Sequence, residues 1–109
     1  MHELSITQSV VDAIAEKMDG ATVTGVCLEI GKLSGVVPDS VRFCFELVCS
    51  GTNLDGAWLD IIETPGHALC QDCRIEFDLS DMILLCPCGS ANVQVLTGQE
   101  LKIKSVEVS

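Results

Sequence analysis

Prolines, basic residues and long apolar runs are all scarce in this chain of 109 residues, which contains only three prolines. With 48% hydrophobic residues the composition is that of a globular protein and excludes a disordered chain. No apolar run approaches the roughly 20 residues that a helix needs to cross a bilayer, so we expect no membrane span. The segment MHELSI also lacks the basic region and the apolar stretch of a signal peptide, and we therefore expect a cytoplasmic protein.

Positive charge is especially scarce. Six lysines and arginines stand against sixteen aspartates and glutamates, which gives a formal net charge of −10. A chain of this charge repels phosphate backbones, so we expect no nucleic-acid partner. Cations, or the basic surface of a partner protein, are better matched to it.

The spacing of the apolar residues predicts a small α+β domain. Intervals of three and four residues predict an amphipathic helix over residues 3–18, and a second helix begins at a Pro-Asp-Ser start signal and covers residues 38–49. Alternating patterns predict strands at residues 23–33, 57–63 and 100–108. Because the chain is too short for two independent cores, we expect the two helices to pack on one three-stranded sheet.

Two of these strands carry further expectations. The first is predicted to be half-buried, with Cys27 and Glu29 on the face opposite its apolar side chains. The last loses its alternation near Ser105, which predicts a β-bulge. Pro65 and Gly66 predict a break after the middle strand.

Seven cysteines indicate metal or redox chemistry, because disulfides are reduced in the cytoplasm. Four of them form two close pairs, Cys70-Gln-Asp-Cys73 and Cys86-Pro-Cys88, whose spacing resembles that of a zinc ribbon. The other three fall on a predicted strand and helix, where a free cysteine commonly packs as a small hydrophobic residue.

The segment around the cysteine pairs has too few large apolar residues to hold itself together. A structural metal supplies such a small unit with folding energy. We therefore predict two domains: residues 1–66 plus 100–109 form the helix-and-sheet domain, and residues 67–99 form an inserted zinc-ribbon-like domain.

Three alternatives stay open for the cysteine pairs. Only Pro87 separates Cys86 from Cys88, so the geometry at the second pair is less certain than at the first. His67 either completes the ligand shell or is an exposed loop histidine. A redox-active dithiol is the third alternative, but Cys73 leads into a strand-like run, so no helix dipole is expected to activate a thiol there.

The first three residues, Met1, His2 and Glu3, offer closely spaced nitrogen donors: an α-amine, backbone amides that can ionise, and an imidazole. Such a set can chelate a square-planar ion, the geometry that nickel(II) and copper(II) favour. From residue types alone, a solvated terminal histidine remains the commoner alternative.

The order of the motifs along the whole chain resembles one family. MHELSI opens a helix, a strand runs into GKLSGVVPDSVRF, and the cysteine pairs, the second within CPCGS, precede a closing GQELKIKSVEV. Together these motifs resemble the HypA/HybF family of hydrogenase nickel-incorporation proteins, although that family more often has CPxCGS at the second pair.

The resemblance implies a nickel metallochaperone that serves maturation of the [NiFe]-hydrogenase active site and is not an enzyme. It further implies a transferred nickel(II), a structural zinc(II), and as partners a nickel-associated GTPase, the hydrogenase large-subunit precursor and, in some members, urease maturation proteins. The alternative is a zinc-stabilised protein-interaction adaptor without a transferable metal. The metal ligands that the resemblance implies are Met1 through its backbone amine, His2 and Glu3 through its backbone for nickel, and Cys70, Cys73, Cys86 and Cys88 for zinc.

Overall fold

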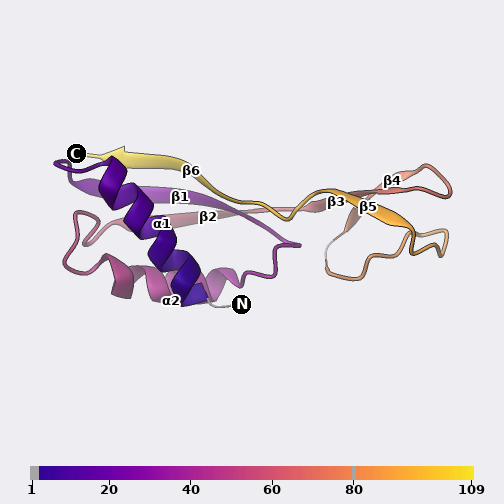
Figure 1. Ribbon diagram of the computed structural model, residues 1–109, viewed down its shortest axis with the longest axis horizontal. Coiled ribbons are helices and arrows are strands. Elements are labelled where there is room, and N and C mark those ends of the chain that lie inside the picture. Colours follow the sequence, from indigo (N-terminus) through magenta and orange to yellow (C-terminus); the bar gives the residue numbers. More distant parts are fainter. Residues whose placement is uncertain (1–2, 80) are drawn as a thin grey trace.

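The computed structural model describes residues 3–79 and 81–109 and has an elongated shape with extents of 53 × 22 × 17 Å (Figure 1). No helix in the described part of the chain is long and apolar enough to cross a membrane. The elements, in chain order, are α1 (Glu3–Lys17), β1 (Val23–Gly31), α2 (Pro38–Cys49), β2 (Trp58–Thr64), β3 (Gly66–Cys70), β4 (Glu76–Leu79), β5 (Val93–Thr97) and β6 (Leu101–Val108).

The first three-stranded sheet has the order β2-β1-β6, with β1 parallel to β2 and antiparallel to β6. Helices α1 and α2 lie together beside this sheet in Figure 1. The parallel pair β1 and β2 is joined through α2, as parallel neighbours require a crossover connection. The expected α+β fold of two helices on a three-stranded sheet is confirmed.

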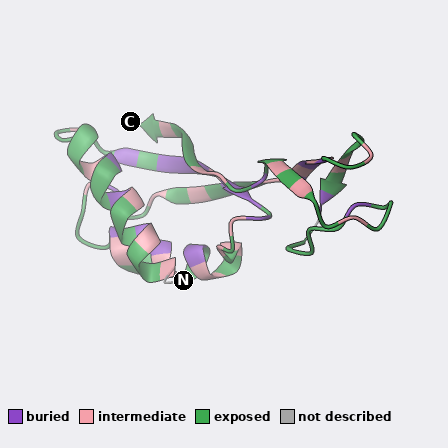
Figure 2. Ribbon diagram, turned by 45° about the vertical axis from the view of Figure 1, so that its right-hand side comes forward, coloured by how far each residue is buried: buried purple, intermediate pink, exposed green. Residues whose placement is uncertain are grey.

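The main core lies between the helices and the first sheet, where the buried segments gather in Figure 2. On each helix the buried positions recur every three or four residues, which places them on one face. Burying one such aliphatic side chain contributes about 1.5–3 kcal/mol. The buried members of this core are Val11, Ile14, Val23, Val26, Leu28, Ile30, Val41, Phe45, Cys49, Leu54 and Ile61.

Strand β1 differs from the expectation of a half-buried strand, because it is buried on both faces. Cys27, on the face away from the main core, is only 7% exposed. The ring of Trp58 covers Gly25 so closely that a Cβ atom added there would lie 1.9 Å from it. The central position of β1 between two partners, with a tryptophan from β2 across it, therefore buries the second face as well.

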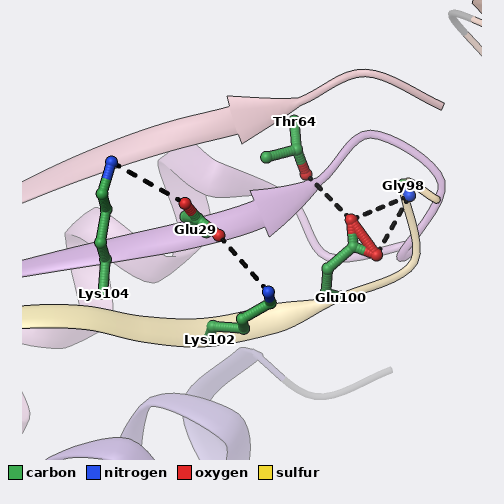
Figure 3. A network of polar contacts seen from close by, with 6 residues as sticks. All are labelled: Glu29, Thr64, Gly98, Glu100, Lys102 and Lys104. Atoms are coloured by element: carbon green, nitrogen blue, oxygen red, sulfur yellow. Dashed lines mark hydrogen bonds and ion pairs between the residues drawn. The ribbon is translucent and has the colours of Figure 1, made fainter.

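The predicted bulge in the last strand is confirmed. The register of β6 against β1 shifts between the pairs Leu28–Ile103 and Cys27–Ser105, so that Lys104 is the extra residue. The bulge lies beside Glu29, whose carboxylate is 3.9 Å from the ammonium groups of both Lys102 and Lys104 (Figure 3).

A second three-stranded sheet, with the order β4-β3-β5, lies at the other end of the molecule (Figure 1). Its central strand β3 was not predicted: the break at Pro65 lasts one residue, and the chain resumes extended pairing at Gly66. The core beneath this sheet is small. It consists of buried Leu33, Ala68 and Leu79, and partly buried side chains around them.

The segments that connect the two sheets are held together by close backbone contacts. A Cβ atom on Gly31 would lie 2.0 Å from the carbonyl oxygen of Gly98, so these two segments approach each other more closely than side chains permit. The Glu100 carboxylate accepts hydrogen bonds from the Gly98 N–H at 2.9 Å and from the Thr64 hydroxyl at 3.4 Å (Figure 3). The Gly98 N–H is the main cause of the lowered pKa of Glu100.

Candidate metal centre

Two tight turns carry the four paired cysteines. Cys70 is the last residue of β3, and its turn closes with a hydrogen bond of 2.9 Å from the Arg74 N–H to the Cys70 carbonyl. The second turn closes with a bond of 2.8 Å from the Gly89 N–H to the Cys86 carbonyl. Arg74 has φ 66° and Gly89 has φ 93°, so each turn uses a residue in the left-handed region.

The structure brings the four sulfur atoms together. All four lie within 4.8 Å of one another, with 3.8 Å between Cys70 and Cys88 and 3.6 Å between Cys73 and Cys86. A tetrahedral zinc ion with Zn–S bonds of about 2.3 Å holds its sulfurs about 3.8 Å apart. Spacing and donor type both fit a structural zinc ion.

The second turn closes one residue sooner than the first, but each contains an N–H that donates to the sulfur of its first cysteine. The Cys88 N–H donates to the Cys86 sulfur at 3.4 Å, and the Cys73 N–H donates to the Cys70 sulfur at the same distance. Gly89 supports the tighter turn because its backbone adopts a conformation that other residues avoid. One intervening residue is therefore enough for Cys86 and Cys88 to face the same point.

The thiols differ in their readiness to ionise. The N–H of Cys73 donates to the Cys70 sulfur and lowers the pKa of Cys70 to about 6, so this group is a thiolate at neutral pH. The N–H of Cys88 acts in the same direction on Cys86, but burial and the neighbouring sulfurs outweigh it and raise the pKa of Cys86 to about 12. The positive charge of a bound cation favours ionisation of all four thiols.

His67 lies in strand β3 rather than in a loop, and it is not part of the sulfur cluster. Its Nδ1 is 2.9 Å from an oxygen of Asp78, and its Nε2 is 2.9 Å from an oxygen of Glu76. Both carboxylates come from β4, where residues two apart point to the same face. Because both ring nitrogens face carboxylates, His67 joins β3 to β4 instead of completing the ligand shell.

We expect this histidine to make the stability of the β3–β4 pair depend on pH. Hydrogen bonds to Asp78 and then to Glu76 raise the pKa of His67 above its usual 6.5. The pKa of His67 is higher in the folded protein than in the unfolded chain, so protonation of His67 stabilises the folded state. This stabilisation is complete below about pH 6.5, as long as the carboxylates remain ionised. It is lost as the pH rises through the raised pKa. The expected result in zinc-loaded protein is an imidazole NMR titration with its midpoint above 6.5, assigned by its absence in His67→Gln.

The matched variant is Asp78→Asn, which keeps the size of the side chain and removes its charge. It should move the midpoint of the His67 titration downward. An unshifted midpoint in this variant would show that the Asp78 contact has no electrostatic effect.

Asp72 connects the two cysteine turns from outside the cluster. Its carboxylate accepts hydrogen bonds from the Ser90 hydroxyl and, at 3.2 Å, from the Asn92 side-chain amide. These bonds lower the pKa of Asp72, the Ser90 contribution being the larger. The Gln71 N–H also donates to the Asn92 carbonyl at 2.9 Å. Residues of the first cysteine turn thereby hold the segment that follows the second cysteine turn. The spacing of the cysteines in the sequence did not reveal this role of Asp72.

Replacement of Asp72 by alanine is expected to weaken zinc retention about tenfold, the lower end of the effects measured for groups that orient metal ligands. The reason is that the second turn loses its side-chain attachment to the first. Competition with a chromophoric chelator measures this effect. Asp81→Ala is the control, because the Asp81 carboxylate bonds only the Ile83 N–H in its own turn among the contacts of the described residues. Equal zinc retention in both variants would contradict the role of Asp72.

The predicted nickel ligands are only partly visible. Met1 and His2 lie outside the described residues. Glu3 is the first residue of α1, and its carbonyl accepts a hydrogen bond of 2.7 Å from the Thr7 hydroxyl. The carbonyl of Glu3 is thus engaged within the helix, whereas its backbone nitrogen is at the helix start, where no intrahelical acceptor exists.

Comparison with known proteins covers almost the whole chain. Residues 1–108 match the family described as "Hydrogenase/urease nickel incorporation, metallochaperone, hypA". The chain belongs to the HypA family. Hydrogenase maturation factor HypA from Geotalea uraniireducens is 51% identical over 109 residues, which cover 99% of both chains. Hydrogenase maturation factor HypA from Nostoc sp. is 49% identical over 108 residues, 99% of this chain and 96% of that protein.

The HypA fold is also recognised in three dimensions. The solution structure of the Ni metallochaperone HypA from Helicobacter pylori matches with a TM-score of 0.66 and 27% sequence identity, and the match covers 99% of this chain and 97% of that one. The expectation of the HypA/HybF family, drawn from the order of the sequence motifs, is confirmed.

Proposed function

We propose that this protein is a nickel metallochaperone that delivers nickel(II) for maturation of the [NiFe]-hydrogenase active site. The observation that carries the proposal is the match of residues 1–108 to a nickel-incorporation family in a chain that opens with Met-His-Glu. Nickel is the cargo of this protein. Its proposed ligands are the Met1 amine, the His2 side chain and the Glu3 backbone nitrogen.

A terminal chelate suits delivery, because an exposed ion can be passed on by ligand exchange. The helix dipole opposes nickel binding at this position. Because α1 begins at Glu3, the positive end of its dipole lies beside the cation, which costs up to about 1 kcal/mol. Ionisation of the backbone amides and the nearby Glu3 carboxylate offset that charge. Square-planar coordination by nitrogen donors favours nickel(II) over zinc(II).

The second metal in the proposal is a resident zinc ion held by Cys70, Cys73, Cys86 and Cys88. A shell of four thiolates leaves no open position, which is typical of structural rather than catalytic zinc. When bound, zinc supplies folding energy to the ribbon. The proposed division is residues 1–66 plus 100–109 for nickel binding and residues 67–99 for the ribbon. The presence of two separate sheets supports this division.

The family role implies partners in hydrogenase maturation. We propose a nickel-associated GTPase and the hydrogenase large-subunit precursor, with urease maturation proteins as further clients, all in the cytoplasm. No catalytic activity is part of the proposal. The thiol oxidoreductase alternative is weakened by the fold, since Cys73 is followed by strand β4 and not by a helix that would activate a thiol.

Metal analysis and nickel titration of the untagged chain test the proposed function. We expect one zinc per chain, and one further nickel bound without displacement of zinc. Zinc at one per chain with no nickel uptake would favour the alternative, a zinc-stabilised interaction adaptor. Loss of zinc on nickel addition would contradict two separate sites.

A further inference from the structure

The outer face of α2 carries two apolar side chains that the core does not use. Phe43 is 79% exposed and Leu47 is 67% exposed. They are four residues apart, so they are neighbours on the helix surface. The core-facing residues of the same helix, Phe45 among them, lie on the opposite side. Helix α2 therefore packs one apolar face against the core. It exposes a second apolar stripe, Phe43 and Leu47, to solvent.

A groove of about 390 Å³ lies along this stripe, lined by Phe43, Glu46, Leu47, Ser50 and Asp55. The charged residues that line it are both acidic. The nearby cation Arg42 is held by Asp39, with 3.0 Å between guanidinium nitrogen and carboxylate oxygen. Two exposed apolar side chains, Phe43 and Leu47, thus lie beside an acidic rim of Glu46 and Asp55 that pairs with no cation among the described residues. The chain as a whole has a net charge of −10.

We propose that this groove is a docking site for a basic amphipathic helix of a partner protein. Apolar side chains of that helix contact Phe43 and Leu47, and its lysines or arginines face Glu46 and Asp55. Large apolar side chains seated in a groove with a charged rim are the usual anchors of such interfaces. The complementary charge sets the choice of partner and its rate of association.

Charge also argues against other occupants of the groove. A second copy of this chain on the same face would bring the two acidic rims together, and like charges at an interface are costly. An anionic lipid surface is repelled for the same reason. The docking site is separate from the cysteine cluster, which lies in the strands and turns at the far end of the molecule (Figure 1). It therefore goes beyond the proposed metal binding and does not depend on it.

The test uses the zinc-loaded full chain and two labelled 18-residue model helices, one with leucine on one face and lysine on the other, and one with glutamate in place of lysine. Fluorescence anisotropy should show binding of the lysine helix and none of the glutamate helix. Phe43→Ser should weaken binding about tenfold or more, as expected for an interface anchor. Neutralising the rim with Glu46→Gln and Asp55→Asn together should have an effect of similar size.

The matched control is Glu63→Gln with Glu107→Gln, which removes the same charge from two exposed positions outside the groove. Binding by this pair within about twofold of the wild type supports a local site. Two results would overturn the proposal in favour of diffuse charge attraction. The first is an equal loss of binding in the control and rim variants. The second is unchanged binding by Phe43→Ser with an unaltered circular dichroism spectrum. Self-association that Phe43→Ser abolishes, or stronger binding to anionic vesicles than to the lysine helix, also overturns it.

Discussion

Removal of zinc by a strong chelator is expected to unfold the ribbon and leave the helix-and-sheet part folded. In native-state hydrogen exchange, the amides of β4, β5 and the two cysteine turns should lose their protection, whereas those of α1, α2 and β1 should keep it. The apparent binding energy of structural zinc is about 10–16 kcal/mol, so its loss exceeds what the small ribbon can offset.

The difference follows from the two cores. The first sheet and its helices share eleven buried core residues, whereas the second sheet has only Leu33, Ala68 and Leu79. Leu33 belongs to the segment after β1, so one of the three buried residues of the ribbon core comes from the helix-and-sheet part of the chain. We accordingly expect protection near Gly66 and Ala68 to fall less than protection in β5.

Zinc repletion of the same sample is the control, and protection of the ribbon should return with it. Equal hydrogen-exchange rates in both parts after chelation would contradict this prediction, because they would show that zinc does not stabilise the ribbon separately from the rest of the chain. The same conclusion would follow if β5 kept its protection while zinc analysis showed less than one-tenth of the ion remaining.

Hydrophobic periodicity was sufficient to predict both helices and the first sheet, because those elements are long and bury one regular face. Strand β3 was missed for a physical reason. Its five residues are too few for a clear period, and the preceding Pro65 predicts a break. What fixes β3 as a strand is its pairing with β4 and β5, which lie later in the chain. The burial of Cys27 depends in the same way on distant neighbours.

The cysteine cluster was predictable because metal-ligand spacing is local in sequence, and two short turns suffice to bring each pair together. The roles of His67 and Asp72 were not predicted, because the first depends on strand register and the second on a contact between the two turns. A sequence signal for His67 does exist in hindsight: Glu76 and Asp78 alternate on a short strand and share one face. For Asp72 the signal is weaker, since Ser90 and Asn92 are also ordinary turn residues.

Substitution of His2 by alanine is expected to abolish tight nickel binding while zinc content and fold remain unchanged. The proposed chelate needs the imidazole, and the described core residues of α1 begin at Thr7 and Val11, well after position 2. Both the α-amine and the imidazole must lose protons to bind. With reference pKa values of about 7.7–8.0 and 6.5, wild-type nickel affinity should fall steeply on acidification toward about pH 6.

An N-terminal extension of a few residues should weaken nickel binding almost as much as His2→Ala, although His2 is still present. The extension converts the terminal amine into a peptide bond, which removes one nitrogen donor and breaks the chelate. A tag of the same length at the C-terminus is the matched control, because β6 ends there far from the proposed ligands in sequence and leaves the amine free. Titration calorimetry that found wild-type nickel affinity in both the His2→Ala and the N-terminally extended protein would exclude the terminal chelate and move the search for the nickel ligands elsewhere in the chain.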